Sequence, residues 1–501
     1  MSSTTDRLVL SRTSAVLRPD PRRILARLFV PGHEHLLPGG SRAAPVLDRI
    51  LALDDRTVAA TLADTMDRFA DRYDDLPRVL ADNFAAVAHR IGARNVVPEA
   101  TRLLVGAYFT QEYSVEAAAL FNPSIVAHPD QSGVAAGELR VILSVRAVGE
   151  GHVSSIGFRT GVVDRDGQAR LDPATDPLVV GEQDQASFDR RLFLSALHEL
   201  GDAGEDAAHV LGTLPDPFSA GDLERAISRL YERLLTRSAA DRTIEHLRWV
   251  ASCNYQVRFP SGTQIGRRVL FPVAPTESHG MEDARFVRFT DDDGTVTYHA
   301  PYTAFDGAHV VPQMLKTDDF TTFRISPLTG PAAVNKGMAL FPRRIDGRFV
   351  ALSRGDRENN AVTTSEDGHI WDEPTTVQTP THPWELIQLG NCGSPIETPA
   401  GWLVLTHGVG PMRRYAIGAM LLDLHDPTLV LAQLAEPLLS PTDAEREGYV
   451  PNVVYSCGAL VHNERLIVPY GCADSSVSVA VIDLPALLDS MLAAPTRARV
   501  R

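Results

Sequence analysis

The first hundred or so residues carry apolar side chains three or four positions apart, which is the spacing of one face of a helix. Polar residues fill the positions between them. This pattern predicts an α-helical N-terminal region over residues 1–115. Its two clearest apolar stripes are Val58, Leu62, Met66 and Phe69, followed by Leu76, Leu80, Phe84 and Val87.

From about residue 116 the pattern changes to short β-rich runs separated by Gly, Asp, Asn and Pro. We expect a β domain over residues 116–490 and a C-terminal tail over residues 491–501. A second helical block, at about 186–248, interrupts the β domain, and Pro215 and Pro217 split it. A connection this long usually has a fold of its own, so we interpret the block as an insertion between two β units.

A weak internal repeat runs through the β region. Five apolar strands each end in a polar or aromatic residue, and the last four recur at intervals of roughly 50 to 60 residues, the range of a propeller blade. Equivalent strand ends of a propeller converge on one channel mouth, whereas in a β-sandwich they are merely solvated, and the spacing alone leaves both folds open. The five segments span residues 139–146, 296–303, 347–354, 401–407 and 464–470, and they end at Arg146, Tyr302, Arg354, His407 and Tyr470.

Composition narrows the classes of function. The chain has 501 residues, a formal net charge of −15 and a pI near 5.5, which argues against nucleic-acid binding and favours a neutral ligand. The N-terminus has no apolar leader and no window is long enough for a membrane span, so we expect a cytoplasmic protein without a membrane partner. The four cysteines show no Cys-x-x-Cys spacing and are expected to be buried thiols, with no metal cluster.

Residues 279–286 carry an unusual density of charge, which places Glu282, Asp283 and Arg285 within four positions before a strand. Alternate residues of a strand share a face, so Asp283 and Arg285 are expected on one side and Glu282 on the other. An Asp beside an Arg is either a plain ion pair or part of a catalytic site. The segment alone does not decide between these interpretations.

This segment resembles the Glu-Asp-Pro-Arg motif of glycoside hydrolase family 130, the β-mannoside phosphorylases and β-mannosidases. Ala284 stands where the family pattern usually has Pro, which relaxes the backbone but keeps the acid and the arginine. Further stretches match in order over about 118–485, apart from the helical insertion. They are Phe121-Asn122-Pro123 with Val145-Arg146-Ala147, Tyr302 to Asp306, Lys336 with Leu340-Phe341-Pro342 and Arg354, Ser394 to Thr398 with His407-Gly408, and Val450 to Gly458 with Tyr470 to Asp474.

The resemblance implies a five-bladed β-propeller. The α-helical N-terminal cap and the helical insertion between the first two blades lie outside the resemblance and are predicted from their periodicity. The resemblance also implies an inverting enzyme with its pocket at the channel mouth and with Asp283 as the general acid, whose proton in the phosphorylases passes through a sugar hydroxyl. The positions that match basic or polar phosphate ligands are Lys336, Arg354 and His407. The positions expected to bind sugar hydroxyls are Asn122, Arg146, Arg285, Tyr302, Asp306, Asn452 and Asp474.

One position favours hydrolysis over phosphorolysis. Glu397 stands where the phosphorylases carry Lys, and a carboxylate there repels phosphate, so the sequence predicts that Glu397 is the base that activates water. The alternative is a salt bridge from Glu397 to Lys336 or Arg354 that only shapes the pocket. Glu358 is a second candidate carboxylate, but a solvated loop charge explains it better.

The sequence therefore predicts an inverting β-mannosidase that acts on small, β-1,2-linked manno-oligosaccharides and needs no cofactor. A phosphorylase or mannosyltransferase that uses inorganic phosphate or mannose 1-phosphate is the alternative, and a non-catalytic carbohydrate-binding propeller is the second alternative. The helical regions are expected either to cover the pocket or to form contacts between identical subunits. The sequence does not choose between these two roles.

Overall fold

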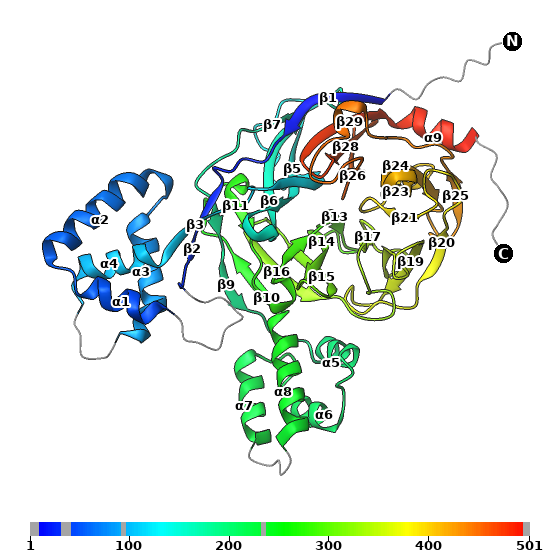
Figure 1. Ribbon diagram of the computed structural model, residues 1–501. Helices are drawn as coiled ribbons and strands as arrows, with labels where there is room; N and C mark the ends of the chain where they lie inside the picture. Colours follow the sequence, from blue (N-terminus) through cyan, green and yellow to red (C-terminus); the bar gives the residue numbers. More distant parts are fainter. Residues whose placement is uncertain (1–9, 32–41, 92–96, 232–236, 494–501) are drawn as a thin grey trace. The chain divides into compact units, whose positions relative to one another are not determined.

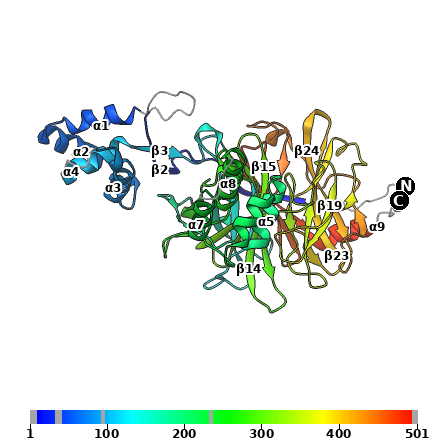
Figure 2. The ribbon, with the colours of Figure 1, turned by 90° about the horizontal axis from the view of Figure 1, so that it is seen from below.

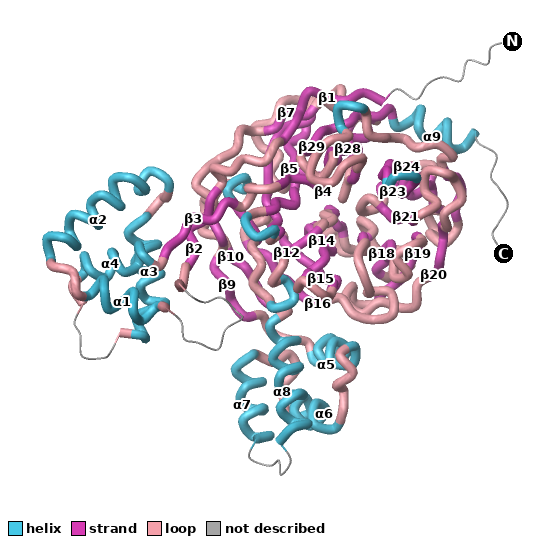
Figure 3. Tube along the Cα trace, viewed as in Figure 1, coloured by secondary structure: helices cyan, strands magenta, loops and turns pink. Residues whose placement is uncertain are grey.

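The computed structural model describes residues 10–31, 42–91, 97–231 and 237–493 (Figure 1). The chain divides into a small unit, residues 20–117 with 175–179, and a large unit made of the rest. The prediction of a mainly β protein with N-terminal helices and a helical insertion is confirmed, and Figure 3 shows where the helices lie along the trace. No helix within the described ranges is long and apolar enough to cross a membrane.

The small unit contains four helices and a two-stranded sheet. Helix α2 begins where Asp54 accepts a hydrogen bond from the Thr57 amide (2.8 Å), and α3 begins where Asp75 accepts one from the Arg78 amide (3.0 Å). The predicted apolar stripes fall on these two helices. The elements are β2 (Ile24–Leu28), α1 (Ala43–Leu51), α2 (Asp55–Phe69), α3 (Leu76–Val87), α4 (Glu99–Tyr108) and β3 (Thr110–Ser114).

The large unit contains five antiparallel arrays of strands around a common centre (Figure 1). Array 1 has β4 (Ala119–Ala127), β5 (Leu139–Val148), β6 (Ser154–Val163) and β7 (Ala169–Leu171), with β11 (Arg268–Leu270) beside β6. Array 2 has β12 (Gly280–Glu282), β13 (Val287–Thr290), β14 (Val296–Phe305), β15 (Val310–Thr317) and β16 (Thr322–Pro327), extended by β10 (Tyr255–Arg258) and β9 (Glu182–Gln185); the short β8 (Val179–Val180) precedes β9.

The remaining arrays follow one another along the chain. Array 3 has β17 (Ala339–Leu340), β18 (Phe349–Ser353), β19 (Asn360–Ser365) and β20 (Thr375–Gln378). Array 4 has β21 (Gln388–Asn391), β22 (Ile396–Thr398), β23 (Gly401–Gly410), β24 (Arg414–Leu422) and β25 (Val430–Gln433). Array 5 has β26 (Val454–Tyr455), β27 (Leu460–His462), β28 (Arg465–Cys472) and β29 (Ser476–Asp483), and α9 (Leu484–Ala493) follows.

The N-terminus adds a strand to the last array. Strand β1 (Leu10–Leu17) pairs antiparallel with β29, and Arg12 of β1 forms an ion pair with Glu445 (3.2 Å). Glu445 also accepts a hydrogen bond from Tyr470 of β28 (2.6 Å). The sequence predicts helix throughout residues 1–115, and strand β1 departs from that prediction. Its short alternation of polar and apolar residues gains a stable partner only when the C-terminal array is present.

The insertion is a four-helix block with its own core, built on Phe188, Phe193 and Phe218. It contacts array 2 where Ser195 donates a hydrogen bond to Thr329 (2.8 Å) and the Gly330 amide donates one to Glu199 (2.6 Å). Figure 2 shows the block beside β15. Its helices are α5 (Arg190–Glu199), α6 (Glu205–Gly212), α7 (Ala220–Tyr231) and α8 (Arg237–Ser252).

The repeated segments found in the sequence are equivalent strands, but each is the second strand of its array. They correspond to β5, β14, β18, β23 and β28. The first strands, β4, β12, β17, β21 and β26, are mostly two to four residues long. Such short runs carry little periodic signal, and they become visible only through their pairing.

All four cysteines are buried and free of disulfides. Cys392 and Cys457 lie in arrays 4 and 5, and burial raises the pKa of the Cys392 thiol to about 12. These thiols are packing groups, which agrees with the expectation from their spacing.

Gly280 is the junction between the first two arrays, and we predict that Gly280→Ala lowers stability by about 2–4 kcal/mol. It pairs in parallel with Ser154 at φ +145°, and a Cβ there would lie 2.6 Å from the Ser154 Cβ. Gly294 also has a positive φ (+83°) but has nothing within 4 Å of a Cβ, so Gly294→Ala is the matched control and costs about 1 kcal/mol. Urea unfolding measures both; equal losses would show that the junction tolerates a side chain.

Candidate active site

The candidate site lies where Asp283 meets residues of array 1. Its Oδ1 accepts hydrogen bonds from Asn122 Nδ2 (2.6 Å) and from Arg146 Nη1 (3.2 Å). Arg146 also donates to Glu282 Oε1 (2.6 Å) and to Ser154 Oγ (2.9 Å), and its guanidinium lies over the Phe121 ring. Asn122 and Arg146 were predicted to accompany Asp283, and the structure brings all three together.

Glu282 and Asp283 contact the same arginine, which corrects the expectation that they face opposite sides. Strand β12 ends at Glu282, and Asp283 has φ +57°, in the left-handed region. Alternation of side chains holds only while the backbone stays extended, so the reversal at Asp283 turns both carboxylates toward Arg146. Glu282 is therefore part of the site, although the strand pattern assigned it to the other face.

Lys336 joins this charge cluster from the loop before β17. Its Nζ forms an ion pair with Glu282, whose side chain is buried, while Lys336 itself stays 37% exposed. Arg146, Glu282, Asp283 and Lys336 thus form a network of two cations and two carboxylates that draws on arrays 1, 2 and 3. Lys336 was predicted to be near the phosphate position, and its exposure leaves it accessible to a ligand.

The pKa of Asp283 reflects this network. Burial pushes the pKa up, but the charges of Arg146 and then Lys336, with the Asn122 hydrogen bond, outweigh burial and lower the pKa to about 2. The free protein therefore holds Asp283 as a carboxylate at neutral pH. A general acid must carry a proton, so the proton has to be acquired when ligands change the surrounding charge.

Arg285 is a buried residue of the site whose donors contact protein groups. It is 2% exposed and donates to the Gly337 carbonyl (3.2 Å), to the side chain of Asn391 and to the Tyr455 hydroxyl (2.8 Å). These partners belong to arrays 3, 4 and 5. Arg285 nevertheless lines a small pocket together with Asp283 and Tyr302, and its predicted contact with sugar stays a prediction.

Arg354 and His407 form a second cationic corner. Arg354 donates to the Leu389 carbonyl (3.3 Å) and to His407 Nε2 (3.1 Å), and His407 Nδ1 lies 3.2 Å from the Asn391 carbonyl. Burial first, then the charges of Arg354 and Arg285, hold the pKa of His407 well below its usual value. His407 is thus neutral, with Nδ1 donating and Nε2 accepting. Arg354 Nε is buried without a hydrogen-bond partner among the described residues.

Asp474 completes the site from the end of array 5. Burial, with repulsion from Asp283, raises its pKa from 3.8 to about 7, against the opposing charges of Arg146 and Arg413. It was predicted to bind sugar, and the structure places it within electrostatic reach of both Asp283 and Arg146. At neutral pH Asp474 is close to half protonated.

Glu397 lies elsewhere, which corrects its predicted role as the base. Both of its carboxylate oxygens bind Arg343 (2.7 and 2.9 Å), its side chain is 43% exposed, and within the described residues it contacts neither Lys336 nor Arg354. Residues of β22 alternate between the two faces, and Glu397 falls on the face turned to solvent. Glu358 is also exposed, in agreement with the solvated-loop interpretation.

Three other predicted sugar ligands are engaged by nearby protein groups. Tyr302 is buried and its hydroxyl donates to Glu277, which also accepts from Tyr255 (2.9 and 2.8 Å). Asp306 caps its own turn by accepting from the amides of Ala308 (2.8 Å) and His309 (2.6 Å). Asn452 accepts from Arg446 Nε (3.1 Å). Tyr470, the last strand-end residue, donates to Glu445 rather than toward the site.

Sequence reasoning missed Glu282, Asn391 and Tyr455. All three stand on or at the end of short first strands, β12, β21 and β26. The only available signal was the position of Glu282 beside Asp283. Asn391 and Tyr455 become recognisable once Arg285 is seen to bond to both.

Comparisons with known proteins agree with these features. The family model of glycoside hydrolase family 130, described as beta-1,4-mannooligosaccharide phosphorylase, matches residues 262–492, a range that includes Asp283, Lys336, Arg354 and His407. The 1,2-beta-oligomannan phosphorylase of Thermoanaerobacter sp. is 34% identical over 235 residues, which cover 44% of this chain and 74% of that protein. The beta-1,2-mannobiose phosphorylase of the same organism is 33% identical over 48% of this chain and 79% of that protein.

A likeness to solved structures is also found. The beta-1,2-mannobiose phosphorylase from Listeria innocua, solved with beta-1,2-mannobiose, is 22% identical at a TM-score of 0.45, and the match covers 76% of this chain and 93% of that chain. A putative glycoside hydrolase from Bacteroides ovatus is 17% identical at a TM-score of 0.46, and the match covers 74% and 89% of the two chains.

Asp474 makes the stability of the protein depend on pH. The folded protein keeps a proton on Asp474 up to about pH 7, whereas the unfolded chain releases it near the ordinary value of 3.8. Stability from this group is therefore present at low pH and is lost as pH rises through 7. We predict that melting temperature falls less between pH 5 and pH 8 in Asp474→Asn than in the natural protein.

The control for this measurement is Asp306→Asn. The pKa of Asp306 is lowered: burial opposes this shift, but the turn amides of His309 and Ala308 outweigh it. Asp306 is therefore ionised at both pH values, and its loss should lower the melting temperature equally at pH 5 and pH 8. An unchanged pH dependence in Asp474→Asn would contradict the assigned proton.

Proposed function

This chain belongs to glycoside hydrolase family 130, and we propose that it cleaves β-mannosides with inorganic phosphate, releasing mannose 1-phosphate. The observation that carries the proposal is the charge of the site. Arg146 and Lys336 contact the carboxylates of Glu282 and Asp283, and the buried Arg285 acts on Asp283 through its charge. Arg354 beside His407 adds a fourth cation, whereas Asp474 is about half protonated. The excess of positive charge suits a dianion rather than water.

One feature each of Lys336 and Arg354 supports a phosphate between them. Lys336 is partly exposed, and Arg354 Nε is a buried donor without a partner among the described residues. A buried donor that lacks an acceptor is costly, and an anion oxygen would satisfy it. The hydrolytic prediction depended on a carboxylate at this corner, and Glu397 instead pairs with Arg343.

The proposed reaction inverts the configuration at the anomeric carbon. A phosphate oxygen, held by Lys336 and Arg354, forms a bond to C1 of the mannosyl unit while the bond from C1 to the glycosidic oxygen breaks. The leaving oxygen receives a proton from Asp283, which takes it up when phosphate binds, and the proton that hydrogen phosphate loses as its oxygen bonds to C1 restores Asp283. A β-mannoside thus becomes α-mannose 1-phosphate and a saccharide shortened by one unit, and atoms and charges balance.

Phosphate binding also accounts for the proton on Asp283. In the free protein Arg146 and Lys336 hold the pKa of Asp283 near 2. A bound dianion offsets these positive charges, so the pKa of Asp283 rises when phosphate is present. Asp283 therefore becomes protonated, and able to act as a general acid, only after phosphate has bound.

We propose two further features, a β-1,2-linked substrate and a five-bladed propeller. The names of the two Thermoanaerobacter relatives support a β-1,2 linkage. The five arrays, with their first strands converging on the site, support a five-bladed propeller.

Product analysis tests the proposal. With β-1,2-mannobiose as substrate, we expect mannose 1-phosphate to form only when inorganic phosphate is supplied, and sulfate in its place should give no cleavage. β-1,4-mannobiose serves as the linkage control and should react more slowly. Cleavage at the same rate without phosphate would establish the hydrolase instead.

Two carboxamide variants test which carboxylate acts. Asp283→Asn removes the transferable proton and should lower the rate at least about 100-fold. Glu397→Gln breaks an exposed ion pair, so it should leave the rate nearly unchanged and cost at most about 1 kcal/mol of stability. Steady-state phosphorolysis, with a thermal melt to verify folding, measures both.

The reverse pattern, with Glu397→Gln inactive and Asp283→Asn active, would restore Glu397 as the base. Full activity in both variants would support a non-catalytic role for this cluster.

A further inference from the structure

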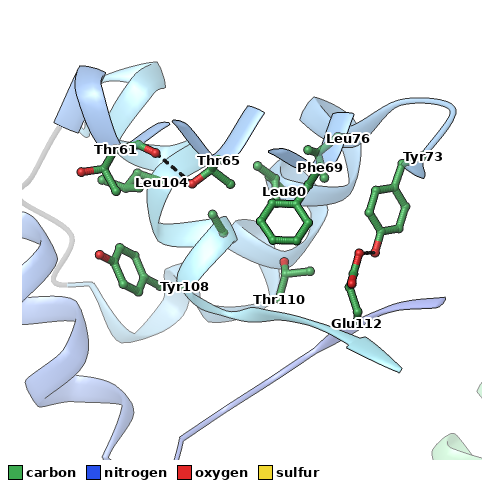
Figure 4. Close-up of a pocket in the computed structure, with 11 residues that line it drawn as sticks. Thr61, Thr65, Phe69, Tyr73, Leu76, Leu80, Leu104, Tyr108, Thr110 and Glu112 are labelled. Carbon is green, nitrogen blue, oxygen red and sulfur yellow. Dashed lines mark hydrogen bonds between the residues drawn. The ribbon is translucent and has the colours of Figure 1, made fainter. Parts of the chain in front are cut away.

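The small N-terminal unit contains a pocket of about 470 Å³ between α2, α3, α4 and β3 (Figure 4). Known ligand sites occupy about 300–1,000 Å³, so the volume is that of a binding site. Residues 20–117 lie outside the matched family range of 262–492. The apolar part of the lining is Phe69, Leu76, Leu80, Leu104 and Ala107.

Close packing of two helices keeps one wall of the pocket rigid. At Gly106 of α4, a Cβ would lie 1.9 Å from the Leu80 carbonyl oxygen of α3, so only glycine allows this approach. Leu80 and Leu104, beside this contact, are buried and line the pocket. The pocket therefore has a fixed wall on α3 and α4.

The hydroxyl groups in the lining are already used by the protein. Thr61 donates to the Thr57 carbonyl and Thr65 to the Thr61 carbonyl, each at 2.8 Å. Tyr73 donates to Glu112 (3.1 Å). A sugar needs protein acceptors and donors, and the hydroxyl protons of Thr61, Thr65 and Tyr73 are already committed to protein groups, so the lining suits hydrocarbon better than sugar.

Thr110, which also lines the pocket, has a hydroxyl group that is likewise bonded to protein groups. Its hydroxyl donates to the Gly106 carbonyl (2.8 Å) and accepts from Asn83 Nδ2 (2.7 Å). Both of its hydrogen-bonding roles are thus fulfilled by the protein.

The charge of the pocket favours a neutral ligand. Glu112 is the charged residue in the described lining, and it is paired with Arg72 (3.1 Å) as well as with Tyr73. Within the described lining, this pairing leaves no net charge to hold an ionic headgroup. Tyr108, whose side chain is the most exposed of the lining at 48%, stands where a polar but uncharged headgroup would meet solvent.

We propose that this pocket binds the hydrocarbon chain of a neutral amphiphile, such as an alkyl glycoside, with the headgroup at Tyr108. A hydrocarbon chain laid against Phe69, Leu76 and Leu80 would remove apolar surface from water, which is the favourable contribution to binding. The proposal stands independently of the phosphorolysis, since it concerns a different unit of the chain.

Calorimetric titration of the full chain with octyl β-D-glucoside, below its critical micelle concentration, tests this site. We expect saturable binding in the natural protein. Ala107→Phe fills the pocket and should weaken binding by about tenfold or more. Ala63→Phe, on an exposed position of α2 outside the lining, is the matched control and should bind as the natural protein does.

Thr65→Phe fills the pocket from α2 instead and replaces Ala107→Phe if that variant does not fold. Octanoate, with the same chain and a charged head, should bind more weakly than the glucoside.

Four results would overturn the proposal. They are no saturable binding, equal binding in the filled variants, displacement of the glucoside by β-1,2-mannobiose, and a lower oligomeric mass in the filled variants. The third result would place binding at the catalytic site, and the fourth would identify the pocket as a contact between subunits. Light scattering gives the oligomeric mass.

Discussion

The network of Arg146, Glu282, Asp283 and Lys336, in which Lys336 alone stays substantially exposed, is the constraint on which the rest of the site depends. Charges taken out of water are tolerated only when each has a partner. Here the partners come from arrays 1, 2 and 3, so the network is complete only when these arrays stand in their native positions. To bring two carboxylates to one arginine, the backbone at Asp283 adopts a left-handed conformation, which is strained for a residue other than glycine.

A second layer extends this dependence to the other arrays. Arg285 is buried among neutral acceptors on Gly337, Asn391 and Tyr455, so its charge is balanced only at longer range, chiefly by Asp283. The Asn391 carbonyl also accepts from His407 Nδ1, and His407 Nε2 accepts from Arg354. The five arrays therefore share one polar centre, whose cations exceed its carboxylates. That surplus is the physical basis of the proposal that phosphate binds here.

The parts outside the family range have different physical characters. The helical insertion has its own aromatic core and is joined to array 2 by a few polar contacts. The small N-terminal unit contains an apolar pocket whose hydrogen-bonding groups are satisfied internally. Among the described residues, neither part supplies a side chain to the charge network of Arg146, Glu282, Asp283 and Lys336.

The sequence alone predicted the mainly β architecture and the helical regions, because hydrophobic periodicity is a local property of the chain. Resemblance to the family, carried by short motifs, singled out Asp283, Arg146, Asn122, Lys336 and Arg354. Only the tertiary structure decided that Glu282 belongs to the site and Glu397 does not. A motif cannot show that the backbone reverses after β12, or that Arg343 pairs with Glu397. Partners far apart in sequence decide these outcomes, and their positions exist only in the folded chain.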